Sequence, residues 1–204
     1  MIKTILFDFD GTLVDTFPII EEEVRKLKGI EKIQNIEFNE MKKLGTKGLI
    51  KKSGIPYWKI PLLIKKLMRE IRNRKDIKLF EGIASMLKQL RKRYRLGIVS
   101  SNSEENIKKI LKENGVEKLF NYIYSASSLF GKHKNLKGLI KEYKLNLEEV
   151  IYIGDEDRDI ITAKRVGVKV IAVTWRYNSK EKLMKEKPDC LVSSPKELEK
   201  IFKG

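Results

Sequence analysis

Two aspartates stand one residue apart at the end of an apolar run near the start of the chain. The run is ILFDFDGT, residues 5–12, and the two acids are Asp8 and Asp10. Residues two apart on a strand face the same way, so both carboxylates can aim at one point. Two carboxylates held together repel each other unless a cation or a shared proton lies between them. The pattern indicates a cation site or acid–base chemistry, and its non-functional interpretation is an acidic turn.

A second acidic group follows another apolar run. The sequence GDEDRD, residues 154–159, places Asp155 and Asp159 four residues apart behind a small glycine. Carboxylate oxygens in this arrangement suit a hard divalent cation. Acidic turns are common, so this cluster alone does not separate a metal site from a solvated turn.

A pair of serines has the character of an anion site. Ser100 and Ser101 follow the apolar run RLGIV and precede a stretch with helical composition. A hydroxyl beside a helix N-terminus, with its free backbone amides, can bind an anion. The alternative is a simple capping box formed by Ser101 and Glu104.

A lysine could join the same anion site. The sequence GKHK, residues 131–134, offers Lys132 and Lys134 just upstream of an expected helix. We favour Lys132 because it directly follows the turn at Phe130-Gly131. A lone lysine is otherwise a solvated surface residue.

The elements that must position these groups follow one pattern. Short β-branched runs alternate with amphipathic stretches, which predicts an α/β fold with a doubly wound, mainly parallel sheet. Strands are expected at Ile2–Phe7, Arg95–Val99, Tyr122–Tyr124, Val150–Ile153 and Val170–Thr174, with a further edge at Asp189–Val192. Helices are expected at Gly82–Arg93, Glu104–Glu113, Asn135–Lys144, Asp159–Val166 and Pro195–Phe202. The chemical groups then lie at carboxyl ends of strands, where open α/β sheets build their sites.

One interval breaks this alternation. Residues 16–77 contain no convincing strand, and apolar residues such as Leu63, Leu67 and Ile71 recur at helical spacing. A loop of this length is unusual inside a compact core, so we expect a small helical subdomain after the first strand. The predicted division is a core of residues 1–15 and 78–204 and a helical cap of residues 16–77.

In this order and at these strand ends, the groups resemble the haloacid dehalogenase (HAD) superfamily, in its phosphoglycolate-phosphatase-like branch. The combination of DFDGT, residues 8–12, with GDEDRD, residues 154–159, carries the resemblance, which covers the whole predicted core. It implies a Rossmann-like core and identifies the helical insertion as a C1-type cap.

The resemblance also implies a role for each acid. Asp8 is the expected nucleophile toward phosphorus, and Asp10 the expected general acid and base. A Mg²⁺ ion is expected on Asp8, the backbone carbonyl of Asp10, and Asp155, with Asp159 orienting the metal shell.

The other groups are expected to hold the phosphoryl oxygens. Ser100, Ser101 and Lys132 would supply hydroxyl, amide and ammonium donors. Gly11 allows a tight turn, and its amide or Thr12 would help to orient the phosphate.

The implied activity is Mg²⁺-dependent hydrolysis of a small phosphomonoester through an aspartyl-phosphate on Asp8. Asp10 argues against the dehalogenase branch, which usually lacks this second aspartate. A sugar-phosphate mutase and a nucleic-acid end phosphatase remain open as alternatives. The non-enzyme alternative is a phosphate-binding or receiver-like module, which the two acids after the first strand and the chain length disfavour. In the cap, Lys47, Lys51, Trp58 and Arg69 are generic candidates for substrate contacts.

Composition indicates the kind of surface, partner and compartment to expect. The 204 residues include 44 Lys and Arg against 28 Asp and Glu, a formal charge of +16. We expect a solvated, thermophile-like surface, because Lys and Glu interleave on the helix faces and no aromatic-plus-basic motif indicates nucleic acid. The expected partner is a small phosphorylated metabolite, with nucleic acid not favoured. The single Cys190, the lack of an apolar leader and the short apolar runs predict a cytoplasmic protein away from membranes. Oligomeric state is not predicted.

Overall fold

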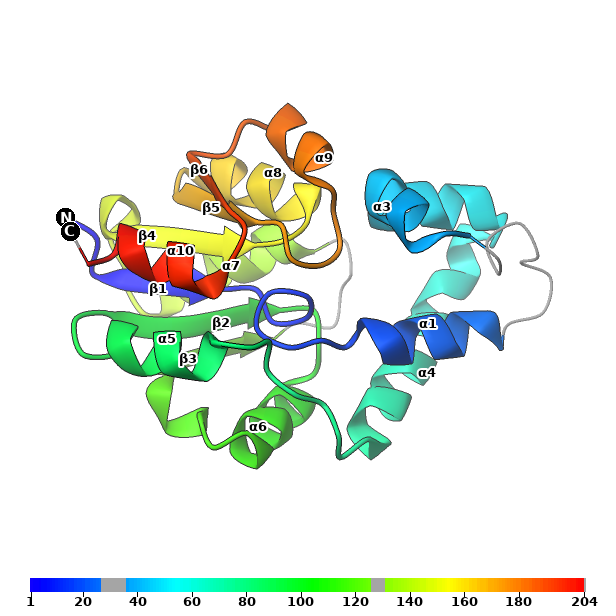
Figure 1. Cartoon of the computed structure of the whole chain (residues 1–204), viewed down its shortest axis with the longest axis horizontal. Helices are drawn as coiled ribbons and strands as arrows, with labels where there is room; N and C mark the ends of the chain where they lie inside the picture. The colour runs from blue at the N-terminus through cyan, green and yellow to red at the C-terminus, as the bar shows by residue number, and fades with distance from the viewer. Residues whose placement is uncertain (27–35, 126–130, 204) are drawn as a thin grey trace.

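The computed structural model describes residues 1–26, 36–125 and 131–203. Its centre is a six-stranded, fully parallel sheet in the order β3-β2-β1-β4-β5-β6 (Figure 1). The strands are β1 Thr4–Phe7, β2 Arg95–Ser100, β3 Tyr122–Ser125, β4 Val150–Gly154, β5 Lys169–Val173 and β6 Cys190–Val192. The chain builds the sheet outward from β1 to β3 and then returns to place β4 on the other side of β1. The strand order therefore reverses between β1 and β4.

Helices cover both faces of this sheet. They are α5 Ile83–Leu90, α6 Glu104–Glu113, α7 Lys132–Glu142, α8 Asp157–Val166, α9 Lys180–Lys185 and α10 Pro195–Ile201. Short 3₁₀ turns lie at η2 Glu117–Leu119 and η3 Leu147–Glu149. The apolar side chains of α5, α6 and α10 pack on one face, and those of α7, α8 and α9 on the other.

The strand sequences explain why both faces are covered. Ile5 and Phe7 of β1 enter the core cluster with α5 and α6, whereas Leu6 between them enters the cluster with α7 and α8. All four residues of β1 are buried. A strand that is buried at every position needs a packed layer on each side, as parallel sheets have.

A helical insertion connects β1 to α5. It comprises α1 Phe17–Arg25, α3 Phe38–Ser53, η1 Tyr57–Lys59 and α4 Ile60–Asn73. In Figure 1 these helices lie at the end of the molecule toward which the strand arrows point. A small apolar cluster of its own holds the insertion together: Ile36 packs with Val24, Met41, Leu44, Leu49 and Ile55.

The two connections to the insertion run side by side. Val14 and Leu79 form an isolated antiparallel bridge. The Phe80 N–H donates to the Leu13 carbonyl at 3.1 Å, and the Asp15 N–H donates to the Lys78 carbonyl at 3.3 Å. The chain therefore leaves and re-enters the sheet at one place.

The predicted fold class is confirmed, with differences at element ends. The first strand begins at Thr4, two residues later than expected, and α8 begins at Asp157, two residues earlier. The helix expected from Asn135 begins at Lys132, and α9 was not expected at all. Six-residue helices such as α9 carry too few turns for a clear apolar period. The division into core and cap stays a prediction, and Phe130 lies outside the described residues.

Candidate active site

The chemical groups meet where the strand order reverses. Asp8 directly follows β1, and its N–H donates to the Ile153 carbonyl of β4 at 2.8 Å. Asp155 directly follows β4, and Ser100 ends β2. Neighbouring parallel strands end at the same edge of the sheet, so residues far apart in sequence converge on one point.

Three acids form a compact, buried cluster. One carboxylate oxygen from each of Asp8, Asp155 and Asp159 lies within 4.8 Å of the others. Burial raises the pKa of Asp155 well above its usual value, and the charges of Asp8 and the other acids raise it further. Gly154 is required for this approach, because a Cβ there would lie 2.4 Å from Cγ of Asp159. Clustered oxygen ligands with excess negative charge suit a hard divalent cation.

Lys132 projects from the first turn of α7 into this cluster. Its ammonium lies 2.8 Å from Oδ2 of Asp8 and also pairs with Asp159. Its side chain is only 3% exposed, and although burial opposes its charge, Asp159 and Asp8 hold the pKa of Lys132 above its ordinary value. Lys134 is exposed on the same helix. The geometry therefore supports Lys132 over Lys134.

Asp159 has partners on several sides. Its Oδ2 accepts from the Glu156 N–H at 3.0 Å, and the Tyr152 hydroxyl donates to its Oδ1 at 3.4 Å. Burial raises the pKa of Asp159 to about 6 against the lowering effect of Lys132. These contacts fix the first turn of α8 against β4, which explains why the helix starts earlier than its apolar period predicted.

Asp10 is held apart from the acid cluster by Asn102. The Asn102 amide donates to both carboxylate oxygens of Asp10 at 3.2 Å. Its own oxygen accepts from the Ser103 N–H and the Asn106 amide, so its orientation is fixed. Burial raises the pKa of Asp10 above its usual value. Sequence analysis missed Asn102, although its position after the serine pair was a usable signal.

Gly11 and Thr12 differ from the expectation that they face phosphate. The Thr12 hydroxyl donates to Oδ1 of Asp155 at 2.8 Å, and the Gly11 N–H donates to the Val14 carbonyl at 2.8 Å. Gly11 has φ +85°, and a Cβ there would lie 2.1 Å from the Tyr177 ring. Both donors are used within the protein, where they shape the turn that carries Asp10.

The two serines after β2 have different surroundings. Ser100 is buried, and its hydroxyl accepts from the Asn102 N–H at 3.0 Å. Ser101 borders the cavity described below. The alternative interpretation of Ser101, a capping box with Glu104, is wrong, because Ser103 caps α6 by accepting from the Asn106 N–H. Ser101 is thus left out of the cap and lies next to the site.

A polar bridge links the insertion to the site. The Thr46 hydroxyl of α3 donates to Oε2 of Glu156 at 2.7 Å, and Arg158 pairs with Oε1 of Glu156 at 2.5 Å. Burial opposes ionisation of Glu156, but Arg158 and Lys132 outweigh it and hold its pKa below the usual value. Sequence analysis did not single out these residues, since nothing in the sequence relates α3 to the turn after β4.

The loop after β5 makes further contacts with the insertion. The Phe17 and Tyr177 rings lie 5.5 Å apart, and the Ser179 N–H donates to the Lys42 carbonyl at 3.2 Å. Arg176 lies over the Phe17 ring at 4.6 Å. Aromatic and cationic groups therefore hold α1 and α3 against the edge of the sheet where the acids lie.

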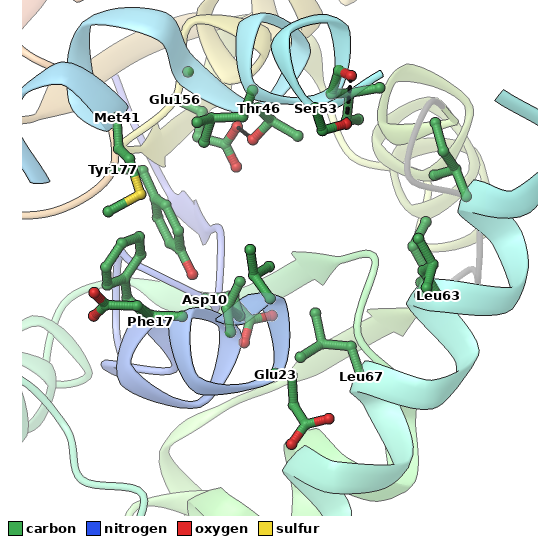
Figure 2. Close-up of a pocket in the computed structure, with 18 of the residues that line it drawn as sticks. Asp10, Phe17, Glu23, Met41, Thr46, Ser53, Leu63, Leu67, Glu156 and Tyr177 are labelled. Carbon is green, nitrogen blue, oxygen red and sulfur yellow. Dashed lines mark hydrogen bonds between the residues drawn. The ribbon is translucent and has the colours of Figure 1, made fainter. Parts of the chain in front are cut away.

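A cavity of about 270 Å³ separates the insertion from this edge (Figure 2). Asp10, Ser101, Glu156 and Tyr177 border it from the core, and apolar side chains of α1, α3 and α4 line most of the rest. The four substrate-contact candidates expected in the insertion are exposed and outside this lining: Lys47, Lys51, Trp58 and Arg69. The structure therefore places these candidates away from the cavity, because charged and aromatic type alone says nothing about which helix face turns inward.

Comparisons with known proteins agree with this architecture. A family model described as haloacid dehalogenase-like hydrolase matches residues 5–173. The chain is 31% identical over 201 residues to a phosphoglycolate phosphatase of Synechococcus elongatus, covering 96% of this chain and 95% of that protein. It is 24% identical over 204 residues to the pyrophosphatase PpaX of Bacillus cereus strain Q1, covering 97% and 94%. The crystal structure of a predicted phosphatase from Clostridium acetobutylicum superposes with a TM-score of 0.85 at 22% identity, covering 100% and 99%.

The fold and the acid cluster define a hydrolase with a Rossmann-like core. More particularly, the chain belongs to the haloacid dehalogenase-like hydrolase family, and the predicted membership is confirmed. Among the described residues, no helix is both long enough and apolar enough to cross a bilayer.

Proposed function

We propose that this HAD phosphatase hydrolyses a small phosphomonoester through an aspartyl-phosphate on Asp8. The observation that carries the proposal is the position of the Asp8 carboxylate between the Lys132 ammonium, 2.8 Å away, and the two acids Asp155 and Asp159. Lys132 offsets part of the negative charge that a phosphate meets beside Asp8, and a divalent cation on the acid cluster would offset more of it. The name of the Synechococcus relative, a phosphoglycolate phosphatase, supports a phosphomonoester, and that of the Bacillus relative, a pyrophosphatase, supports hydrolysis at phosphorus more generally.

The acid cluster fits a divalent cation. Asp8 and Asp155 would hold Mg²⁺ with the backbone carbonyl of Asp10, and Asp159 would orient the ligand shell, as expected from sequence. Burial raises the pKa of Asp155 first of all, and the negative charges of Asp8, Glu156 and Asp159 raise it further, so a bound cation would stabilise its ionised form. When bound, the ion would neutralise charge on the phosphoryl oxygens.

Asp8 and Asp10 have different roles in the proposed reaction. A carboxylate oxygen of Asp8 forms a bond to phosphorus as the bond from phosphorus to the ester oxygen breaks, and Asp10 donates its proton to the departing alcohol. Asp10 then takes a proton from water, whose oxygen attacks phosphorus and releases phosphate from Asp8. The raised pKa of Asp10 favours the protonated form that the first step needs. The Asn102 amide holds the carboxyl in place for both steps.

The remaining residues position the phosphate. Lys132 supplies a fixed positive charge beside Asp8. Ser100 and Ser101 lie at the end of β2, the strand that pairs with β1. We assign Gly11 and Thr12 to shaping the site, because their donors already serve Val14 and Asp155.

Residues 16–77 would act as a cap over a core of residues 1–15 and 78–204. The cavity lies between the two parts, and the adjacent connections at Val14 and Leu79 give the insertion one hinge. A cap of this kind excludes bulk water and selects the alcohol part of the substrate. The cytoplasm stays the expected compartment, in keeping with the free thiol of Cys190.

Turnover of para-nitrophenyl phosphate with Mg²⁺ tests the proposal. Acid quenching during turnover, followed by borohydride reduction, should convert Asp8 to homoserine, which mass spectrometry detects. Labelling of another residue, or equal turnover in excess EDTA, would contradict the proposed chemistry.

The two alternative functions, sugar-phosphate mutase and nucleic-acid end phosphatase, need their own assays. A mutase would isomerise β-glucose 1-phosphate in the presence of glucose 1,6-bisphosphate with almost no phosphate released. A nucleic-acid end phosphatase would bind a short 3′-phosphorylated oligonucleotide in a strongly salt-dependent manner. Phosphate release from several small monoesters, without either behaviour, is the expected result.

A further inference from the structure

The cavity has an unusual distribution of polarity. Its wall on the insertion side consists mainly of aliphatic side chains from three helices: Val24, Met41, Leu49, Ile60, Leu63 and Leu67. In Figure 2, Leu67 extends from α4 toward the space that Asp10 borders on the other side. Asp10, Ser101 and Glu156 supply polar groups at the core end, and charged residues of the insertion such as Glu23 and Lys66 also border the cavity.

The position of Asp10 fixes what this cavity receives. Under the proposed function, Asp10 protonates the ester oxygen of the leaving alcohol, so that oxygen must lie beside its carboxyl. The phosphate lies on the other side, with Asp8 and Lys132. The rest of the alcohol then extends away from the acid cluster and into the space that the insertion encloses.

Most of the cations that line the cavity are already paired with acids, and Lys42 instead contacts a neutral carbonyl. Lys66 lies 3.2 Å from Oε2 of Glu23, and the Glu23 carboxylate points away from the open space in Figure 2. The Lys42 ammonium donates to the Thr174 carbonyl at 3.4 Å. An alcohol with its own carboxylate or second phosphate would have to break such a pair to be neutralised.

Two arginines complete this lining and are engaged in the same way. Arg158 pairs with Glu156 at 2.5 Å, and Arg25 with Glu21 at 2.6 Å. Among the described residues, the lining thus offers an anionic alcohol mostly apolar contacts, with Lys66, Arg25 and Arg158 already holding acids.

We propose that the alcohol part of the physiological substrate is a short apolar chain or ring. This rests on the proposed function and specifies the substrate class of that site. The volume of about 270 Å³ lies just below the range of roughly 300–1,000 Å³ that drug-sized ligands occupy, which limits the chain or ring to a small one. Burial of each methylene stabilises by about 0.8 kcal/mol, which corresponds to about a four-fold gain in kcat/KM.

A substrate series tests this directly. Straight-chain alkyl phosphates from ethyl to hexyl have leaving alcohols of nearly equal acidity, so differences in kcat/KM report contacts to the chain. We expect about a four-fold rise per methylene until the cavity is full, with 2-phosphoglycolate hydrolysed more slowly than propyl phosphate. A flat series, or a ten-fold preference for 2-phosphoglycolate, would overturn the inference and leave the phosphatase intact. Failure to hydrolyse any ester would overturn the proposed function itself.

Two neighbouring leucines of α4 provide a test variant and its control. Leu63 lines the cavity, whereas Leu62 on the same helix is 71% exposed. Leu63→Phe should lower kcat/KM for hexyl phosphate about ten-fold while ethyl phosphate changes less than two-fold. Leu62→Phe should change neither, and circular dichroism should show both variants folded. If Leu62→Phe and Leu63→Phe changed kcat/KM alike, the proposal that the alkyl chain lies against Leu63 would be contradicted. If Leu63→Phe does not fold, the wild-type series still decides.

Discussion

At the scale of single residues, the site depends on how a few carboxylates are kept apart. Asp8 pairs with Lys132, whereas Asp10 receives two hydrogen bonds from the neutral amide of Asn102. Burial raises the pKa of both carboxyls; Lys132 is the main group that opposes this rise at Asp8, whereas the hydrogen bonds from Thr16 and Asn102 oppose it at Asp10. Two aspartates of one turn thereby acquire different environments, as a nucleophile and an acid require.

Asp8→Asn tests the nucleophile. An amide cannot form the phosphoryl intermediate, so we expect turnover of para-nitrophenyl phosphate to fall on the order of 10⁴-fold or more. Asparagine has nearly the same shape as aspartate, so the far-UV circular dichroism should match the wild type. Wild-type turnover by the variant would rule out covalent chemistry on Asp8.

Asn102→Ala tests the residue that positions Asp10. Loss of hydrogen bonds to a charged or partly charged carboxyl should reduce turnover of an alkyl phosphate about 10- to 100-fold. An aryl phosphate, whose leaving group needs little protonation, should lose less. The ratio of the two rates is the measurement, since a merely structural effect would lower both alike.

Asn121→Ala is the matched control. Its side chain accepts from the Leu96 N–H at 3.1 Å at the opposite end of β2. It should lower stability slightly and leave the ratio of alkyl to aryl rates unchanged. A shift of the ratio in this variant would show that the ratio is not specific to Asp10.

Lys132→Ala and Lys134→Ala separate the two lysines. Removing Lys132 leaves two buried acids unpaired, which should cost about 3–5 kcal/mol in the free energy of unfolding and at least about 100-fold in turnover. Lys134 is exposed, so its loss should change the free energy of unfolding by less than about 0.5 kcal/mol. Chemical denaturation and steady-state kinetics measure both, and a larger kinetic loss for Lys134 would move the role to it.

The sequence indicated the four aspartates and Lys132 better than the residues that contact them. The acids and Lys132 stand beside apolar runs, so their positions follow from the order of the strands. Asn102 contacts Asp10 across 92 residues, and Thr46 contacts Glu156 across 110. Such partners depend on where a loop or a helix face comes to rest, which local patterns do not contain.

At the scale of elements, α3 is interrupted where it meets the core. Gly45 has φ +64° and ψ 178°, and a Cβ there would lie 2.5 Å from Cε of Lys182. This backbone region is essentially restricted to glycine. The interruption lets residues on either side of Gly45 approach the core, including Thr46 at Glu156.

Gly45→Ala should disturb this approach. We expect a loss of about 1–3 kcal/mol in the free energy of unfolding and a lower kcat/KM, because α3 must shift away from Glu156. Gly54→Ala is the control, since Gly54 also has positive φ, +72°, but a Cβ there meets nothing within 4 Å. Denaturation and kinetics together should show a stability loss in both variants and a kinetic loss only at Gly45.

Elements of the sheet were predictable because each strand carries an unbroken apolar run. The insertion was recognisable as helical because its apolar residues, such as Leu63, Leu67 and Ile71, recur at helical spacing. The interruption at Gly45 and the direction of each helix face were not predictable, because they depend on contacts with the loop after β5.

At the scale of the whole molecule, charge is distributed unevenly. The chain carries a formal charge of +16, yet its buried centre gathers Asp8, Asp155, Glu156 and Asp159. Like charges held together destabilise the folded state, and a cation that binds only the folded state restores stability by mass action. The site is therefore coupled to the stability of the protein.

Mg²⁺ should stabilise the protein against heat. At about 100 times its dissociation constant, a ligand of the folded state adds about 2.7 kcal/mol, which for a chain of this size raises Tm by roughly 5–10 °C. Differential scanning calorimetry in Mg²⁺ and in EDTA measures the shift. Asp155→Asn should reduce it strongly, and an unchanged shift in that variant would place the ion elsewhere.

The adjacent connections at Val14 and Leu79 have a consequence for evolution. A segment whose two ends leave and re-enter a scaffold at one place can be exchanged for another without altering the order of the strands. The insertion of this enzyme is a replaceable module in that sense. Transplanting it onto the core of a relative should carry the preference for the alcohol with it, while the acids that act on phosphorus stay with the recipient.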